Sequence, residues 1–575
     1  MRRALPPTGF GPNTVRRAGL SPLLRPPCHR ARGVGAFHSK SPNASEAVAP
    51  VAKTANTPAG TIAAKPAPPP ARNRITIADI AARRAKAGRL IAGTAAASDT
   101  SMFKGPSAGK LPALRFDHHL SPESASRVPC MLKQAARHLK KPNLISLGGG
   151  LPCADNFPFN SLSLNISPPP SFPELSSGVT LPIEKYSATR SPTTSEYDLS
   201  IALNYGQANG SAQLNRFCAE HTELAHAPLY SDWASCLTVG STGALEQLLR
   251  MFCDKERGDT VLTEEYSFST AVETAMPLGI KVAGVEMDEE GMIPSALDRL
   301  LKEWKGERRP HVLYTVPSGQ NPTGATMGVQ RRREIYEVAR RWDLMILEDE
   351  PYYFLQMPVR GTPAQETVEG FLDGLIPSLL SMDADGRVVR MDSFSKVVVP
   401  GSRVGWITAS EQIVERYIRH AEVCNQGPSG FSQVILHKLL DESWGHEGYF
   451  RWLMHLRGEY TRRRNVLMEA CDEFLPRGVV TWDVPRAGMF HWIKVDHTRH
   501  PDFPTKSILE IEEDIFNRCI EKGVLVGRGS WFRAEHEKPP RDMFFRTTFA
   551  AATPENMKEA IKRLGGAIRE AYRAG

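Results

Sequence analysis

From about residue 111 onward, short apolar runs rich in valine, isoleucine and leucine alternate with amphipathic patterns of helical length. The runs are CLTV, TVLT, KVAGVEM, HVLYTV, LMILED, RVVRMDSF and RVGWITA, which begin at residues 236, 260, 281, 311, 344, 387 and 403. Strands that alternate with helices build βαβ units and a mostly parallel sheet. The pattern therefore predicts an α/β fold. Residues 159–198, rich in Ser, Pro and Thr, interrupt it and predict a long surface loop.

Sheets of this kind bind ligands beyond the carboxyl ends of their strands, so the polar residues that follow each run are the candidates for a site. RVVRMDSF is followed by Lys396, with Ser393 and Arg403 on either side of it. A lysine at the mouth of a buried strand is poorly hydrated, which lowers its pKa and makes the amine nucleophilic. Ser393 and Arg403 are suited to bind a phosphate. An ordinary surface lysine is the alternative, and the grouping of the three residues argues against it.

Two neighbouring runs also end in polar residues. HVLYTV leads to Asn321 in an NPTG turn, where the amide can donate a hydrogen bond into the site, although a plain turn explains the motif equally well. LMILE leads to Asp349, and Tyr352 follows three residues later. A carboxylate there can keep a pyridine nitrogen protonated. The alternative is a helix-capping aspartate.

Two further runs complete the set. CLTV leads to Ser241 and Thr242 in a glycine-rich turn before a helix, where free backbone N–H groups and the helix dipole favour a phosphate. TVLT leads to Tyr266, whose ring can lie over an aromatic ligand. Taken together, these residues suit a phosphorylated pyridine ring that carries an aldehyde. No metal-ligand set, Ser-His-Asp order or Walker loop competes with this interpretation in the sequence.

In combination these residues resemble the class I/II aminotransferases of the aspartate-aminotransferase fold, and especially the fungal aromatic and kynurenine/2-aminoadipate aminotransferases. The likeness spans roughly residues 115–575. Its motifs are SLGGGLP, LNYG, NPTG, EDEPYYFLQ, SFSKVVVPGSRVGW, PRAGMFHW and FFRTTFA, which begin at residues 146, 203, 321, 348, 393, 485 and 544. The last two look like a C-terminal strand pair. The resemblance implies fold type I of the pyridoxal-phosphate enzymes, with a large domain and a small α/β domain.

By that resemblance, Lys396 forms a Schiff base with pyridoxal phosphate and moves the proton of the substrate Cα. Asp349 keeps the ring nitrogen protonated, so that the ring acts as an electron sink. Arg546 grips the substrate α-carboxylate, and Gly149 and Asn321 also contact the substrate. The further cofactor contacts are Ser241, Thr242, Tyr266, Asn321, Tyr352, Ser393, Arg403 and, from a neighbouring subunit, Tyr205. The implied unit is a homodimer that transfers an amino group to a 2-oxo acid such as 2-oxoglutarate.

The net charge of +8 is concentrated at the N-terminus. Residues 1–110 contain 18 Lys and Arg and 3 Asp and Glu, which gives +15 and leaves −7 for the remainder. Residues 1–40, rich in arginine and free of acidic residues, predict a mitochondrial transit peptide, with a basic cytoplasmic tail as the alternative. Residues 41–110 predict a disordered Ala/Pro-rich linker, in which residues 74–92 have helical spacing.

The remaining boundaries follow the resemblance. We expect 111–204 to be the N-terminal segment of the small domain, 205–425 the large cofactor-binding domain and 426–575 the C-terminal small domain. The nine cysteines are scattered without a CxxC pair, which favours reduced thiols. No apolar run is long enough to span a membrane, and the acidic body does not favour nucleic acid.

Two other functions remain open on the sequence. A β-lyase or decarboxylase can use the same fold and cofactor. Some transcription regulators fuse an aminotransferase-like domain to a winged helix, but residues 1–110 are too rich in Pro, Ala and Gly for such a domain.

Overall fold

We describe the protein from a computed structural model. It describes residues 75–90, 92–96, 103–140, 143–169, 172, 178–189, 195–359 and 367–573. The expected leader, 1–40, and the first part of the expected linker lie outside these residues.

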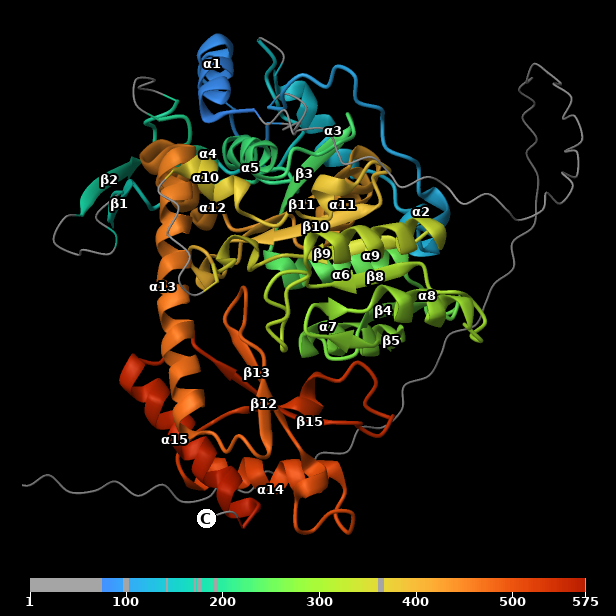
Figure 1. Cartoon of the computed structure of the whole chain (residues 1–575). Helices are drawn as coiled ribbons and strands as arrows, with labels where there is room; N and C mark the ends of the chain where they lie inside the picture. Colours follow the sequence, from blue (N-terminus) through green and yellow to red (C-terminus); the bar gives the residue numbers. More distant parts are fainter. Residues whose placement is uncertain are drawn as a thin grey trace, which may run out of the picture. The chain divides into compact units, whose positions relative to one another are not determined.

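The centre of the fold is a seven-stranded sheet with the strand order β3-β11-β10-β9-β8-β4-β5 (Figure 1). Its strands are β3 (Trp233–Thr238), β4 (Thr260–Glu264), β5 (Lys281–Val285), β8 (Val312–Thr315), β9 (Met345–Asp349), β10 (Val388–Ser393) and β11 (Gly405–Ser410). Neighbours from β10 to β5 are parallel, and β11 is antiparallel to both of its neighbours. Each predicted apolar run supplies one of these strands, which confirms the mostly parallel α/β fold.

Helices cover both faces of this sheet. One face packs on α6 (Gly240–Phe252), α7 (Ser269–Ala275) and α11 (Glu411–Cys424), and the other on α8 (Pro294–Lys302) and α9 (Val329–Arg341). Val312, Met345 and Val389 face the first group of helices, while a residue next to each of them in its strand faces the second group of helices. Because both faces are buried, the strands are apolar throughout instead of alternating with polar residues.

A second, four-stranded antiparallel sheet has the order β12-β13-β15-β14. Its strands are β12 (Val480–Trp482), β13 (Phe490–Val495), β14 (Gly527–Arg528) and β15 (Met543–Thr548), and its helices are α14 (Ile508–Glu521) and α15 (Pro554–Ala571). The 30-residue helix α13 (Gly445–Phe474) leads to this sheet and packs on α15 (Figure 1). β13 and β15 are the strand pair expected from PRAGMFHW and FFRTTFA, and they do pair.

The shorter elements connect these layers. They are α2 (Pro122–Ser126), α3 (Met131–Ala136), α4 (Leu199–Ala202), α5 (Ala212–Ala225), α10 (Val368–Asp373), α12 (Gly430–His437), β6 (Met287–Asp288) and β7 (Gly291–Met292). In the described part of the chain, we find no helix with the length and apolar character that a membrane crossing requires.

The prediction of a loop over residues 159–198 is wrong for part of that range. β1 (Ser161–Ile166) and β2 (Val179–Glu184) pair as an antiparallel hairpin. Leu162 and Leu164 alternate with polar residues, and they pack with Ile183 against Val434 of α12. This period of two marks a half-buried strand.

Part of the range 111–204 contacts the large-sheet unit. In its described part, the backbone N–H of Leu114 donates to Asp385 and that of Ser121 to Met251, both in the large-sheet unit. The reason is that Phe116 and Leu120 are buried in the core that covers this sheet.

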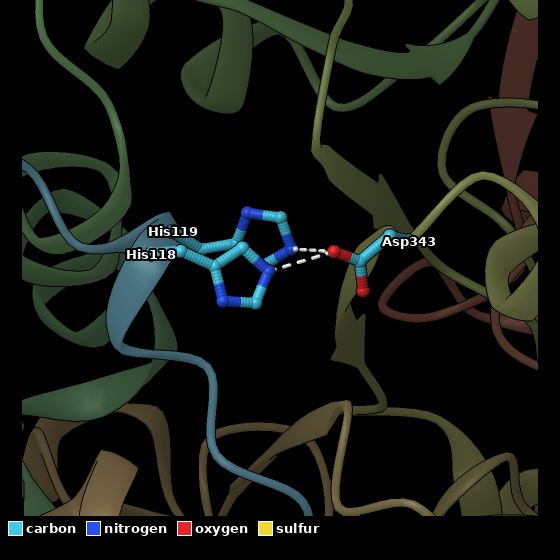
Figure 2. Close-up of side chains that lie close together, drawn as sticks. All are labelled: His118, His119 and Asp343. Atoms are coloured by element: carbon cyan, nitrogen blue, oxygen red, sulfur yellow. Dashed lines mark hydrogen bonds and ion pairs between the residues drawn. The ribbon is translucent and has the colours of Figure 1, made fainter. Parts of the chain in front are cut away.

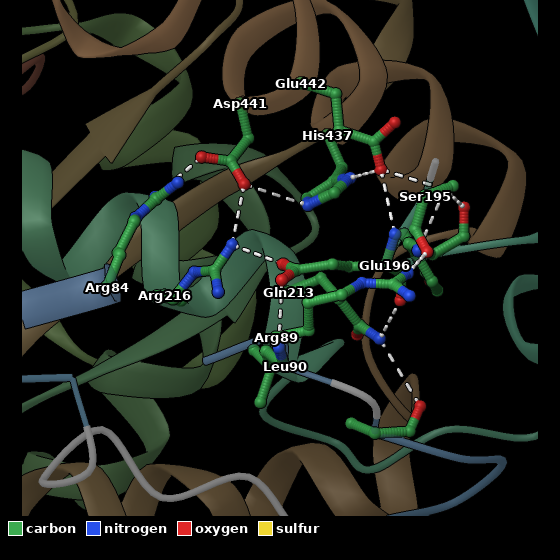
Figure 3. A network of polar contacts seen from close by, with 12 residues as sticks. Arg84, Arg89, Leu90, Ser195, Glu196, Gln213, Arg216, His437, Asp441 and Glu442 are labelled. Carbon is green, nitrogen blue, oxygen red and sulfur yellow. Dashed lines mark hydrogen bonds and ion pairs between the residues drawn. The ribbon is translucent and has the colours of Figure 1, made fainter. Parts of the chain in front are cut away.

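The structure places a helix, α1 (Ile77–Ala87), inside the expected linker and within the stretch of helical spacing. Thr76 and Asp79 form a capping box at its start. Arg84 reaches two buried carboxylates, with its Nε 3.0 Å from Glu220 Oε1 and its Nη2 2.6 Å from Asp441 Oδ1. Figure 3 shows Arg84 and Arg216 converging on Asp441. From Ile75 onward, the described part of this range is therefore docked on the body of the protein.

We expect Arg84→Met to destabilise the protein by about 1–3 kcal/mol, because it leaves two buried carboxylates with fewer partners. Denaturant midpoints measure the effect. The matched control is Arg563→Met, which removes an exposed pair with Glu559 and should cost less than about 0.5 kcal/mol. Equal midpoints for the two variants would show that α1 adds nothing to stability.

Candidate active site

Lys396 lies in the turn that follows β10, at the carboxyl edge of the central sheet. Its side chain is half-buried, and its amine makes no hydrogen bond or ion pair with any described residue. Burial, together with the charges of Arg403 and Arg546, lowers its pKa below the ordinary value. A larger fraction of the amine is therefore unprotonated and nucleophilic than in an exposed lysine.

Asp349 ends β9, directly beside the strand that leads to Lys396. Its Oδ2 accepts a 2.8 Å hydrogen bond from the Tyr314 hydroxyl, while its Oδ1 is buried without a partner. Burial raises the pKa of Asp349 to about 6, although the Tyr314 bond opposes the shift. A buried acceptor without a partner is costly, so Oδ1 is suited to a donor from a ligand.

The small sheet contributes Arg546 from β15. Its Nη1 donates to Asn321 Oδ1 at 2.8 Å, which joins β15 to the NPTG turn of the large unit. The guanidinium carbon lies 4.4 Å from the ring centroids of both Phe490 and Phe532. Burial lowers the pKa of Arg546, and Tyr352, itself buried, is near enough to act on that charge. The two rings fix the fork of the arginine, which can still bind a carboxylate.

The start of α6 and the loop after Lys396 lie close together. Gly240 has φ 68°, and a Cβ there would lie 2.5 Å from Arg403 Nη2, so glycine allows this approach without strain. Arg403 Nη1 donates to Ser395 Oγ at 3.3 Å, and the Ser393 hydroxyl accepts from the Ser395 backbone at 3.1 Å. The Ser241 hydroxyl has no partner. With Thr242 exposed at the same helix start, these groups fit a phosphate.

Tyr266 is buried beside the small sheet. Its ring centroid lies 5.4 Å from that of Trp492 and 5.2 Å from that of Phe544. Gln320 Nε2 donates to its carbonyl at 2.6 Å, which ties it to the NPTG turn. A cleft of about 480 Å³ opens beside the three rings.

Two predicted residues stand apart from this cluster in the single chain. Tyr205 is 56% exposed, and Gly149 is exposed with no atom within 4 Å of a Cβ built on it. Their expected contacts with cofactor and substrate stay predictions.

The sequence interpretation missed four residues that shape the site: Tyr314, Phe490, Trp492 and Phe544. Tyr314 belongs to an apolar run and looked like ordinary core. The aromatic residues share one face of the small sheet with Arg546, as their strand positions require. That common face is the signal that could have identified them.

A family model described as "Aminotransferase class I and II" matches residues 186–564, about two thirds of the chain. The chain belongs to this family. It is 44% identical to an aromatic amino acid aminotransferase of Schizosaccharomyces pombe, over 80% of this chain and 98% of that one. It is 36% identical to an L-tyrosine:2-oxoglutarate aminotransferase of Serpula lacrymans, over 72% of this chain and 83% of that one.

A further relative and a solved structure agree. A mitochondrial kynurenine/alpha-aminoadipate aminotransferase of Bos taurus is 32% identical, over 80% of this chain and all of that one. The crystal structure of aminotransferase Aro8 from Candida albicans superposes with a TM-score of 0.75 and 39% identity, over 81% of this chain and 100% of that chain. The chain is therefore an aminotransferase with fold type I, as the sequence predicted.

The raised pKa of Asp349 predicts that the folding stability of the cofactor-free protein depends on pH. The folded pKa of about 6 exceeds the ordinary 3.8, so the wild type loses stability as the pH rises from about 4 to 6 and stays lower above that range. Asp349→Asn, which cannot ionise, should avoid this loss and gain up to about 3 kcal/mol at pH 8.

Thermal midpoints at pH 4 and pH 8 measure the difference. Asp472→Asn, an exposed carboxylate paired with Arg477, is the matched control and should change little. If Asp349→Asn gave the same midpoint shift at both pH values, the carboxylate would not be held at a raised pKa.

Proposed function

We propose that this aminotransferase uses pyridoxal phosphate to move the amino group of an aromatic amino acid to a 2-oxo acid such as 2-oxoglutarate. 2-Aminoadipate and kynurenine are further donors of the same proposal. The observation that carries it is the unpartnered amine of Lys396, with its lowered pKa, beside the buried carboxylate of Asp349 and the fixed guanidinium of Arg546.

The residues of the site fit this cofactor in two respects. The free Oδ1 of Asp349 offers a partner to a protonated ring nitrogen, and the close approach of Gly240 and Arg403 offers a phosphate cradle. When bound, the cofactor supplies an electrophilic carbon and an electron sink. In this proposal, Asn321 and Tyr352 would bind the ring hydroxyl, and Tyr266 would contact the ring. Ser241, Thr242, Ser393 and Arg403 hold the phosphate.

Residues of the same site have separate roles toward the substrate. Arg546, clamped between Phe490 and Phe532, binds the α-carboxylate and so fixes the Cα, with Gly149 as a further contact. Lys396 would hold the cofactor and would carry the proton that leaves the substrate Cα. Because the amino group is stored between the two half-reactions, we expect ping-pong kinetics.

The aromatic preference rests on two supports. Relatives at 44% and 36% identity carry aromatic amino acid and L-tyrosine in their names. The rings of Tyr266, Trp492 and Phe544 line a cleft next to the site and suit a planar side chain.

We further propose a homodimer in which Tyr205 reaches the partner's cofactor phosphate. Its exposure in the single chain, together with several exposed apolar residues, supports this arrangement. These residues are Val128, Met131, Leu132, Ile145, Leu147, Val399 and Val423. We also propose a mitochondrial location, supported by the arginine-rich residues 1–40 and by the mitochondrial relative.

Replacing Lys396 tests the proposal. We expect Lys396→Ala to lower turnover of tyrosine with 2-oxoglutarate by about 10³-fold or more, because it removes both the covalent anchor and the proton carrier. Borohydride reduction followed by peptide mapping should attach the cofactor to Lys396 alone. Lys255→Ala, an exposed lysine between α6 and β4, is the matched control. Full turnover in Lys396→Ala, or attachment elsewhere, would refute the mechanism.

A further inference from the structure

Two adjacent histidines and an aspartate converge on one point of the surface, away from the active site. His118 and His119 lie in a short 3-10 helix (Asp117–His119), and Asp343 lies in the turn between α9 and β9. His118 Nε2 is 2.7 Å from Asp343 Oδ2, and His119 Nε2 is 3.1 Å from the same oxygen (Figure 2). Three ligand atoms, from residue types that can bind zinc, lie within 4.8 Å of one another.

His119 is the residue that points to a ligand. Its side chain is only 6% exposed, its Nε2 contacts Asp343 Oδ2, and its Nδ1 is buried without a hydrogen bond. A buried polar group without a hydrogen bond is uncommon and calls for a partner.

The surroundings leave one carboxylate oxygen available. Arg387 Nη1 lies 3.5 Å from the other oxygen of Asp343, Oδ1, and Arg115 is paired with Asp117. His311 stacks on His119, with ring centroids 4.9 Å apart. Asp343 Oδ2 therefore faces the two imidazoles alone among the described residues.

We propose that His118, His119 and Asp343 bind a zinc ion, with water as the fourth ligand. Zinc bonds of about 2.0–2.1 Å place tetrahedral ligand atoms about 3.3 Å apart. The observed separations of 2.7 and 3.1 Å need only a few tenths of an ångström of widening. His118 and Asp343 are 56% and 50% exposed, which leaves room for the water and a path for the ion.

A second cluster, of Glu196, His437 and Asp441, shows what an ionic network without a metal looks like. Arg216 pairs with both acids, Arg84 also reaches Asp441, and His437 contacts Asp441 at 3.1 Å (Figure 3). In this second cluster, the guanidinium groups of Arg84 and Arg216 already supply positive charge. At the zinc cluster, Arg387 reaches only the oxygen that faces away from the histidines.

The zinc site would act on stability. The zinc ion would join the segment 113–127 to the turn before β9. Asp349, at the other end of β9, lies about 20 Å from that turn, at roughly 3.3 Å per residue, so the zinc site is remote from the active site. An ion at this point restrains the segment that packs Phe116 and Leu120 into the core. Zinc should therefore raise the unfolding temperature and leave turnover unchanged.

The test uses the full-length, cofactor-loaded protein, treated with a chelator and then exposed to zinc chloride before gel filtration. We expect the wild type to retain one zinc ion per chain more than His118→Ala and Asp343→Asn do. His536→Ala, an exposed histidine outside the cluster, is the matched control and should retain the same zinc as the wild type. X-ray absorption of the bound zinc should show two imidazole ligands.

Zinc should also raise the thermal midpoint of the wild type and of His536→Ala but not of the two site variants. Turnover and circular dichroism check that all variants are folded; since His118 is exposed, its removal should leave both unchanged. Equal zinc content in all four proteins, or none in the wild type, would overturn the proposal. Failure of the zinc test would leave the aminotransferase proposal intact, because the two sites share no residue.

Discussion

The site depends on one constraint of the fold, namely that parallel strands end at the same edge of a sheet. β8, β9 and β10 are consecutive neighbours, so the segments that follow them meet there. These segments carry Asn321, Asp349 and Lys396, from positions spread over 76 residues of sequence. The small sheet then adds Arg546 through its hydrogen bond to Asn321. Packing of apolar runs on both faces thus assembles the chemistry without any local sequence contact.

Burial at this edge makes the site residues reactive and also lowers the stability of the protein. It lowers the pKa of Lys396 and raises that of Asp349, since the charged form of each group loses hydration. Asp349 keeps one oxygen without a partner, and Arg546 is held between two rings at the expense of hydration. Such groups destabilise the empty protein, and a ligand that carries a phosphate and a protonated ring would satisfy them. Elsewhere in the described residues, the buried carboxylate of Asp441 is paired with two arginines.

Much of the fold and site could be predicted because the signals are local. Seven apolar runs marked the central strands, and the residues directly after them marked the candidate site. What could not be predicted depends on partners far away in sequence. Tyr314 looked like core until Asp349 was placed beside it, and Arg84 lies 136 residues from Glu220. His118 and His119 could be recognised as a candidate site only beside Asp343, which lies 225 residues from His118 in the sequence. The hairpin at 161–184 was missed although its leucines alternate, because Ser and Pro content outweighed that pattern.

The most direct test of the central claim is the absorption spectrum of the purified protein, before and after phenylalanine is added. We predict a visible band from cofactor held on Lys396, which gives way to the band of the aminated cofactor and returns when 2-oxoglutarate follows. This exchange would establish the cofactor and both half-reactions in one cuvette. A protein that shows no such band, even after pyridoxal phosphate is supplied, would contradict the account, since Lys396 would then hold nothing.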